Sequence, residues 1–306
     1  MADETLSTGP ERIAKFDFGL DLEDTHVLVT GGKGHIGSVV VAAFVDAGAK
    51  VSSLDYKHAQ QTDEDLVPDM EQDRLQRIHC DISNVTSMNR AWNSATKYFG
   101  VVEVCITLAG LDLSALIQTE SLCDVEPASW LEILNVNVGG TFLTSQLWLE
   151  GIREHMASPT APVLKNPGLI LIGSEAGHFG VRTNAAYAAS KSAVQFGLLQ
   201  SLRADIPRIC SRARVNAVAP GPVDTKAFRE ETGGPGSKEW WTECEATTAL
   251  RKPVAIESVA RSLVFLASER WSSNVHGQIL NVDSGKQGAL MWPPQEAQTQ
   301  KVLSDG

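Results

Sequence analysis

Tyr187 and Lys191 are the residues whose types and spacing point most directly to chemistry. Side chains four apart on a helix lie on one face, a turn apart, so a phenol and an ammonium would be neighbours. Both titrate near pH ~10 in water, and a cation beside the phenol is expected to lower the pKa of Tyr187 towards the working range. Ser174, thirteen residues earlier, could hold a carbonyl oxygen while Tyr187 gives or takes its proton.

A glycine-rich turn supplies a second signal. An apolar run over 27–29 predicts a strand, and the periodicity of 38–47 predicts a helix after it. Between them, Gly32, Gly34 and Gly37 have the spacing G-x-G-x-x-G, which lets backbone approach a pyrophosphate at the start of a helix. The residues expected to contact a dinucleotide here are Gly31, Gly32, Lys33, Gly34, His35, Ile36 and Gly37.

Asp55 ends the next predicted strand, eighteen residues past Gly37. An acid in this position accepts hydrogen bonds from a ribose 2′-hydroxyl and repels a 2′-phosphate, so NAD(H) is expected in preference to NADP(H). Lys33 and Lys57 lie close to Asp55 in sequence and weaken that preference, so NADP(H) stays possible.

Further motifs follow in order along the chain: Cys80-Asp81-Ile82, Thr107-Leu108-Ala109-Gly110, Asn135 to Phe142, Asn216 to Thr225 and Leu280 to Gly285. With them the chain resembles the short-chain dehydrogenase/reductase (SDR) family from about Asp24 to Lys286. The resemblance is to the short subtype, with a glycine loop of the extended-type spacing.

The resemblance implies roles for particular residues. Asn137 would hold a water in the proton relay, and Lys191 would bind the nicotinamide ribose and lower the pKa of Tyr187. The remaining cofactor contacts implied are Asp81 and Ile82 near the adenine, Ala109 and Gly110 after the fourth strand, and Pro220, Gly221, Val223 and Thr225 near the nicotinamide, with Tyr187 and Lys191.

Two departures from the family pattern stand out. His35 occupies a position where the short subtype usually has glycine, and the spacing through Gly34 is also that of the extended subtype, which includes epimerases and dehydratases. Leu108 replaces an asparagine whose amide normally ties the central sheet together, which puts sheet geometry and the adenosine contacts in question.

Alternating elements predict an α/β fold: one doubly wound parallel-sheet Rossmann domain. Strands are expected at 27–30, 50–54, 75–79, 102–108, 168–173, 212–218 and 277–282, and helices at 36–47, 86–99, 128–156, 186–206 and 255–268. The expected boundaries are an N-terminal extension over 1–23, the SDR-type domain over 24–286 with a substrate lid at about 222–253, and a tail over 287–306.

Composition excludes several classes of function. A net charge of −11 argues against nucleic acid or an anionic membrane as partner. No apolar run approaches the ~18 residues of a membrane span, and residues 1–10 lack signal-peptide character, so a cytoplasmic protein is expected. Five scattered cysteines suit reduced thiols, and no metal site is expected. The acidic run over 60–73 reads as a solvated excursion.

The lid should carry the substrate information. Glycines over 233–236 predict flexibility, and Trp240 and Trp241 could either cover an apolar ligand or pack against the body or a neighbouring subunit. His178 could donate a proton, although a lone loop histidine is usually solvated. Glu175 would make the pocket unfavourable for carboxylate substrates unless it points away.

These residues together predict an NAD(P)-dependent oxidoreductase that interconverts a secondary alcohol and a ketone on a small apolar molecule. The catalytic set would be Asn137, Ser174, Tyr187 and Lys191. An SDR-type epimerase, dehydratase or cyclase without net oxidation is the first alternative, and a non-catalytic dinucleotide-binding protein is the second. A homodimer or homotetramer is the corresponding expectation.

Overall fold

A computed structural model describes residues 17–59, 73–181 and 183–291 of the chain. In these ranges seven parallel strands form one sheet in the order β3-β2-β1-β4-β5-β6-β7. The direction in which strands are added reverses between β1 and β4, and ligands of open α/β sheets bind at such a switch point. The predicted doubly wound parallel sheet is confirmed.

The strand bounds lie within two residues of those expected from sequence. They are β1 (His26–Thr30), β2 (Lys50–Asp55), β3 (Leu75–His79), β4 (Val104–Thr107), β5 (Gly168–Ile172), β6 (Arg214–Pro220) and β7 (Ile279–Val282). Strands β1, β4, β5 and β6 are buried along their whole length, because helices cover both faces of the sheet.

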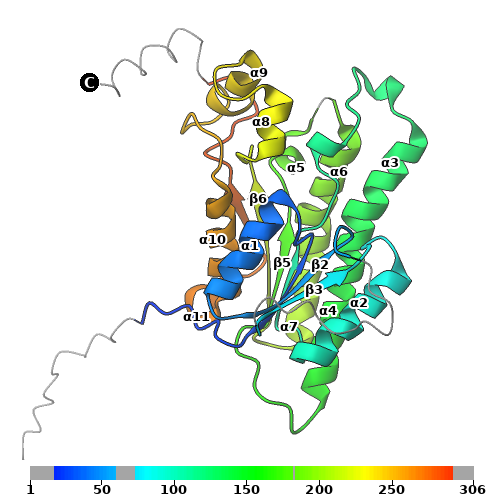
Figure 1. Ribbon diagram of the computed structural model, residues 1–306, viewed down its shortest axis with the longest axis vertical. Helices are drawn as coiled ribbons and strands as arrows, with labels where there is room; N and C mark the ends of the chain where they lie inside the picture. The colour runs from blue at the N-terminus through cyan, green and yellow to red at the C-terminus, as the bar shows by residue number, and fades with distance from the viewer. Residues whose placement is uncertain (1–16, 60–72, 182, 292–306) are drawn as a thin grey trace, which may run out of the picture.

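Two apolar clusters fill the space between sheet and helices. On one face, α1 (His35–Asp46) and α10 (Ile256–Ala267) pack together and bury Phe44 and Leu263. On the other, α2 (Val85–Phe99), α4 (Gly140–Ala157) and α7 (Leu199–Ile209) bury Trp148 and Leu199. Figure 1 shows the sheet enclosed between these layers.

Two long helices expected to be continuous are each interrupted by a π-helical turn. The first runs from α3 (Pro127–Leu134) through η3 (Asn135–Gly139) into α4, and the second from α6 (Ala185–Ser192) through η4 (Ala193–Leu198) into α7. Such turns occur often at functional sites. Asn137 lies inside the first, and the second begins two residues after Lys191.

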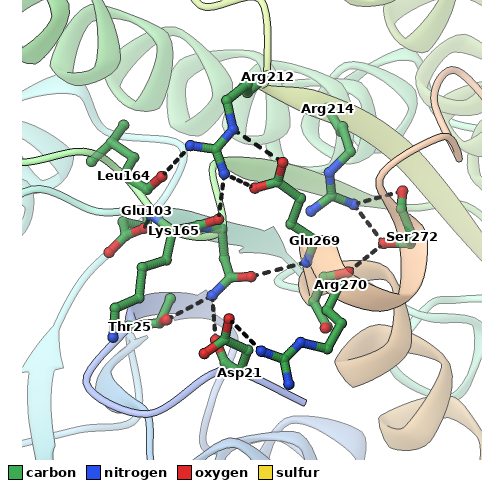
Figure 2. A network of polar contacts seen from close by, with 12 residues as sticks. Asp21, Thr25, Glu103, Leu164, Lys165, Arg212, Arg214, Glu269, Arg270 and Ser272 are labelled. Carbon is green, nitrogen blue, oxygen red and sulfur yellow. Dashed lines mark hydrogen bonds and ion pairs between the residues drawn. The ribbon is translucent and has the colours of Figure 1, made fainter. Parts of the chain in front are cut away.

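The described end of the predicted N-terminal extension, 17–23, packs against the body of the domain. Leu22 is buried, and Figure 2 shows the polar network beside it. The amide of Asn166 donates to the carbonyl of Asp21 (2.7 Å) and to Thr25 Oγ1 (2.9 Å), and accepts from the backbone N–H of Glu269 (2.9 Å). The remainder of the extension (1–16), residues 60–72 of the acidic run and the tail beyond 291 lie outside the described residues.

His26 is the buried titratable group of β1. Its Nδ1 donates to the carbonyl of Gly100 (3.0 Å), and its Nε2 lies 2.9 Å from Ser52 Oγ. Burial lowers the pKa of His26 to about 4, because a charged imidazolium cannot keep its hydration there. Between this value and the ordinary pKa of 6.5, the unfolded chain binds a proton that the folded protein excludes.

We expect His26 to make the fold sensitive to acid. Its contribution to stability is fully present above pH 6.5 and is lost as the pH falls to about 4, by up to about 3 kcal/mol. Urea unfolding at pH 7 and pH 5 should show this loss in the wild type and a smaller loss in His26→Gln. His155→Gln, which alters a surface histidine, is the control. An equal acid loss in the wild type and in His26→Gln would assign the sensitivity to other groups.

Candidate active site

The predicted site residues gather at the edge of the sheet where the strands end. The glycine turn follows β1, Asp55 ends β2, Gly110 lies beyond β4, Ser174 follows β5, and Pro220 ends β6. In Figure 1 this edge lies towards the upper end of the molecule, beside α5 (Ala176–Phe179), α6 and α8 (Lys226–Thr232). The structure therefore brings together the two motifs that the sequence separates by more than a hundred residues.

Ser174, Tyr187 and Lys191 form one buried group, and each is only 8% exposed. Asn184 caps α6 by accepting the backbone N–H of Tyr187 (2.9 Å), which starts the helix where the tyrosine faces the serine. Lys191 Nζ lies 5.7 Å from the centroid of the Tyr187 ring and donates to the carbonyl of Ile172 (3.1 Å). The predicted meeting of these three side chains is confirmed.

The expected lowering of the pKa of Tyr187 is wrong for this structure. Burial raises the pKa of Tyr187 to about 12, and the hydrogen bond with Ser174 offsets only part of that rise. Burial likewise lowers the pKa of Lys191 to about 8, because its ammonium is also removed from water. The phenol is therefore protonated at neutral pH and available as a proton donor.

Asn137 joins the chain after β4 to the helix that carries the tyrosine. Its Oδ1 accepts from the N–H of Leu111 (2.8 Å), and its Nδ2 donates to the carbonyl of Leu111 (3.1 Å) and to Ser190 Oγ (3.1 Å). Ser190 adjoins Lys191, so Asn137 fixes the Gly110–Leu111 segment beside the lysine. Its expected role in holding a water stays a prediction.

The glycine turn is shaped for close approach of backbone. A Cβ on Gly37 would lie 2.0 Å from the carbonyl oxygen of Gly31, and a Cβ on Gly32 would lie 2.2 Å from Ser53 Oγ. Gly31 has φ of +72°, which favours glycine. No side chain caps α1 after Gly34, and its first turn holds no acid, so the start of the helix suits a pyrophosphate.

Asp55 ends β2 with its carboxylate held in place. Its Oδ2 accepts from the backbone N–H of Lys33 (2.9 Å), and its Oδ1 accepts from that of Lys57 (2.8 Å). Each oxygen keeps a lone pair for a further donor. The carboxylate thus lies directly beside the glycine turn, where the sequence places a ribose.

The two other residues predicted to contact the adenosine, Asp81 and Ile82, have different surroundings. Asp81 Oδ1 accepts from both the N–H and the hydroxyl of Ser83, so this carboxylate closes its own turn. Ile82 is buried against Gly140. These contacts position the segment after β3, and direct contact with a cofactor stays a prediction for both residues.

Leu108 stands where the family usually has an asparagine, and a different hydrogen-bonded link joins the central strands here. The N–H of Ala109 donates to Thr30 Oγ1 (3.1 Å), and the Thr30 hydroxyl reaches the carbonyl of Ile106 (3.4 Å). Because Thr30 ends β1 and Ile106 belongs to β4, this hydroxyl links the two strands at the switch point. The sheet geometry put in question by Leu108 is maintained.

The Pro-Gly loop leads from β6 into the predicted lid. Val223 pairs with Val254, and Thr225 Oγ1 caps α8 by accepting the N–H of Phe228 (3.0 Å). A Cβ on Gly221 would meet the backbone of Asp283 at 2.8 Å, so only glycine fits this crossing. The Thr225 hydroxyl keeps its hydrogen for the nicotinamide contact that the resemblance implies.

The two tryptophans of the lid have different environments. Trp240, which ends α9 (Lys238–Trp240), is 4% exposed; its ring packs 5.4 Å from that of Phe228, and its Nε1 donates to Glu245 (3.0 Å). Trp241 begins η5 (Trp241–Glu245) and is half-buried, with an indole N–H that has no hydrogen-bond partner. Trp240 therefore belongs to the core of the predicted lid, and Trp241 is the more exposed of the two.

The second half of the predicted lid is fixed to the end of the predicted domain and the first residue of the tail. The N–H groups of Ala249 and Leu250 donate to Gly285 and Ser284 (both 3.0 Å), and the N–H of Gln287 donates to Thr247 (2.9 Å). Residues 246–250 are thus fastened to 284–287. Only the first half of the lid, over 225–245, lies free of this backbone pairing.

Lys286 was not singled out by sequence, yet it contacts Glu175, the residue that follows Ser174. Its Nζ lies 3.5 Å from Glu175 Oε2 and 3.8 Å from Glu243 Oε2, and it donates to the carbonyl of Glu243 (2.7 Å). Burial raises the pKa of Glu175 to about 7, although Lys286 opposes the rise. No local pattern could reveal this contact, because Lys286 and Glu175 are far apart in sequence and meet only in the folded chain.

His178 is not simply solvated, as the sequence suggested. Its ring packs edge-on against Phe196 at 5.2 Å between centroids, and its Nε2 lies 3.1 Å from Asn281 Oδ1. The histidine is therefore engaged with β7 and η4. These contacts make it a packing residue of α5.

Comparisons with known proteins agree with this geometry. Residues 32–287 match a family model described as enoyl-(acyl carrier protein) reductase. An acetoacetyl-CoA reductase of Synechocystis is 29% identical over 267 residues, covering 86% of this chain and 97% of its own. A 3α-hydroxysteroid dehydrogenase of Mediterraneibacter gnavus is 30% identical over 270 residues, covering 86% and 96%.

Solved structures share the fold. The crystal structure of gox2181 superposes with a TM-score of 0.73 at 29% identity, covering 87% of this chain and 97% of its own. A short-chain dehydrogenase of Leptospira borgpetersenii with bound NAD+ has a TM-score of 0.69 at 23% identity, covering 89% and 96%.

The chain belongs to the short-chain dehydrogenase/reductase family. It is accordingly an NAD(P)-dependent oxidoreductase that acts on CH–OH or C=O groups of small molecules. In the stretches that the structure describes, no helix is both long and apolar enough to cross a bilayer. The same stretches hold no group of three or more His, Cys, Asp or Glu side chains arranged to bind a metal ion.

We expect Glu175→Gln to stabilise the protein at alkaline pH. The raised pKa of about 7 means that folding opposes ionisation of Glu175; this contribution to stability is present below pH 4.5 and is lost as the pH rises through 7. Removing the charge should raise the free energy of unfolding at pH 8 by up to about 3 kcal/mol and change it little at pH 4.5.

Urea unfolding at the two pH values measures this effect. Glu243→Gln, which alters the more exposed partner of Lys286, is the control and should show a small change at both. An unchanged or lower stability of Glu175→Gln at pH 8 would show that the ion pair with Lys286 outweighs burial.

Proposed function

We propose that the protein interconverts a secondary alcohol and a ketone on a small apolar molecule, with Ser174, Tyr187, Lys191 and Asn137 as its catalytic set. The observation that carries this proposal is the buried grouping of the serine, tyrosine and lysine at the sheet edge that also holds the glycine turn. A protonated phenol beside a hydroxyl suits proton donation to a carbonyl oxygen.

The dinucleotide, when bound, supplies or accepts the hydride. The residues suited to hold it are those of the glycine turn, whose contacts leave no room for a Cβ at Gly32 or Gly37. In reduction, the hydroxyl of Ser174 orients the carbonyl oxygen and Tyr187 donates its proton to that oxygen. Lys191 binds the nicotinamide ribose, and Asn137 anchors the water that returns the proton.

Tyr187 has at neutral pH the protonation state that the reduction step requires. The pKa of about 12 keeps the Tyr187 phenol protonated, which suits donation to a ketone. Oxidation of an alcohol requires the phenolate, whose population rises with pH. The two curated relatives named above, a reductase and a dehydrogenase, act on keto and hydroxyl groups by name and support the same chemistry.

The substrate proposal rests on the groups beside the serine. Glu175 and Glu243 add negative charge around Lys286, which disfavours an acidic substrate. Trp241 on the lid and the half-exposed ring of Phe179 offer apolar surface near the same edge. A neutral ketone with an apolar body fits these surroundings best.

We further propose NAD(H) as the preferred cofactor and a cytoplasmic homodimer or homotetramer as the working form. Asp55 supports the cofactor choice, since its oxygens accept backbone N–H groups of Lys33 and Lys57 beside the glycine turn and have no direct ion pair in the described residues. Exposed Leu131 and Phe142 on α3 and α4 support assembly, because large apolar side chains on one helical face are typical of subunit contacts.

Tyr187→Phe removes only the hydroxyl, so fold and dinucleotide affinity should survive. Steady-state turnover on a ketone panel, followed by absorbance of the reduced nicotinamide, should fall by about 10²–10⁴-fold. Tyr98→Phe, on the surface of α2, is the matched control and should leave turnover unchanged. Near-normal turnover of Tyr187→Phe with cofactor bound would refute this mechanism, and binding of cofactor without turnover by the wild type would favour a non-catalytic protein.

Asp55→Ser should narrow the preference for NADH over NADPH by at least about tenfold, a difference of about 1.4 kcal/mol, because the repulsion of the 2′-phosphate is removed. Fluorescence titration of both cofactors gives the ratio of dissociation constants. Asp46→Ser, on the exposed face of α1, should leave that ratio unchanged. Tighter binding of NADPH than NADH by the unmodified protein would contradict the assignment to Asp55.

A further inference from the structure

Gln195 is fully buried in η4, four residues beyond Lys191 on the helix that carries Tyr187. Its Oε1 accepts the backbone N–H of Ser174 at 2.9 Å. The spacing of four from Tyr187 to Lys191 and again to Gln195 keeps all three towards the turn that holds the serine. The amide therefore reaches the catalytic turn from the same helix as the phenol and the ammonium.

The backbone N–H of Ser174 has no partner in the sheet. Its neighbours Gly173 and Glu175 donate to β6, at Val218 (2.8 Å) and Pro220 (2.9 Å). Successive N–H groups of a parallel strand point to opposite sides, so that of Ser174 points towards β4. The pairing of β4 with β5 ends at Thr107 and Leu171, and the side chain of Gln195 supplies the acceptor that β4 does not reach.

Two glycines make room for this amide. A Cβ on Gly173 would lie 2.2 Å from Gln195 Oε1, and a Cβ on Gly177 would lie 2.7 Å from its Nε2. The Gln195 amide thus packs against Gly173 and Gly177, which lie before and after Ser174 in the chain. Any side chain at these glycines would displace the group that holds the serine.

The Nε2 of Gln195 is buried and has no hydrogen-bond partner. The opposite orientation of the amide would set its NH₂ group against the N–H of Ser174, so the contact with the serine fixes the orientation and leaves Nε2 unpaired. A buried donor without a partner costs free energy. Gln195 therefore keeps its hydrogen bond with the N–H of Ser174 and leaves its own Nε2 without a partner.

We propose that Gln195 is a positioning residue for Ser174. By holding the N–H of the serine, it sets the place of Oγ against the phenol of Tyr187. This inference rests on the proposed function, in which the Ser174 hydroxyl orients the carbonyl oxygen. Gln195 touches neither substrate nor cofactor and acts only through the serine.

Gln195→Met keeps the length of the side chain and removes the acceptor. We expect kcat/KM for a ketone substrate to fall about 10- to 100-fold, while the Kd of the dinucleotide stays within about twofold. Gln195→Glu, assayed near pH 6 where a buried carboxyl is protonated and still offers a carbonyl acceptor, should recover most of the loss. A loss shared equally by cofactor affinity would point to a general packing defect and overturn the proposal.

A double-mutant cycle separates positioning from packing. If Gln195 acts through Ser174, adding Gln195→Met to Ser174→Ala should cost little further activity. The same factor of loss in both backgrounds would overturn the proposal. Unchanged activity of Ser174→Ala alone would instead refute the proposed function of the serine, and the inference with it.

Gly177→Ala tests the same contact with Gln195 intact, should Gln195→Met fail to fold. The added methyl group should push the amide away and reproduce the loss in kcat/KM. Gly197→Ala is the matched control in the same π turn, since a Cβ there meets nothing within 4 Å. Equal, near-wild-type activity of the two alanine variants would overturn the proposal.

Discussion

The parallel alignment of seven strands places all their carboxyl ends at one edge of the sheet. A parallel strand can be reached only by a crossover that returns the chain to the opposite edge, so every loop at the carboxyl edge is free to carry chemistry. Because of this constraint, the glycine turn, Asp55 and Ser174 share one edge of the sheet with the switch point between β1 and β4. The Thr30 hydroxyl closes that switch point where this chain lacks the usual asparagine.

Burial then decides the chemical state of the groups that meet there. Tyr187 and Lys191 are both removed from water, and each pKa moves towards the neutral form, to about 12 and about 8. Electrostatic interactions are stronger in such surroundings, so a small movement of the lysine or of Glu175 would have a large effect on the phenol. Desolvation thus sets the protonation states of Tyr187 and Lys191 as much as the pairing of the phenol with the ammonium does.

The sequence predicts the alternation of strands and helices well, because apolar runs and the intervening periodic segments are long enough to be distinguished. It does not predict the π turns at Asn137 and beyond Lys191, since one extra residue in a helix hardly changes its apolar pattern. The candidate site is likewise predicted only in part from the sequence. Ser174, Tyr187 and Lys191 lie in a local motif. Gln195 bonds to Ser174, and Lys286 to the adjoining Glu175, through contacts that only the folded chain creates.

The distribution of unpaired buried groups shows where stability is sacrificed. Five buried side-chain atoms in the described ranges lack a hydrogen bond, and three of them belong to Glu175, Gln195 and Trp241. Glu175 follows Ser174, and Gln195 accepts the backbone N–H of Ser174, so two of these atoms belong to residues that adjoin one serine turn. The Oε2 of Glu175 has only the 3.5 Å ion-pair contact with Lys286. Native proteins pair nearly all such groups, so the geometry of this turn is kept at some cost in local stability. Arg214 differs from this serine turn. Its unpaired Nε belongs to a guanidinium whose other two nitrogens donate to Leu266 and Ala267 of α10 and to Ser272 of α11 (Glu269–Ser272).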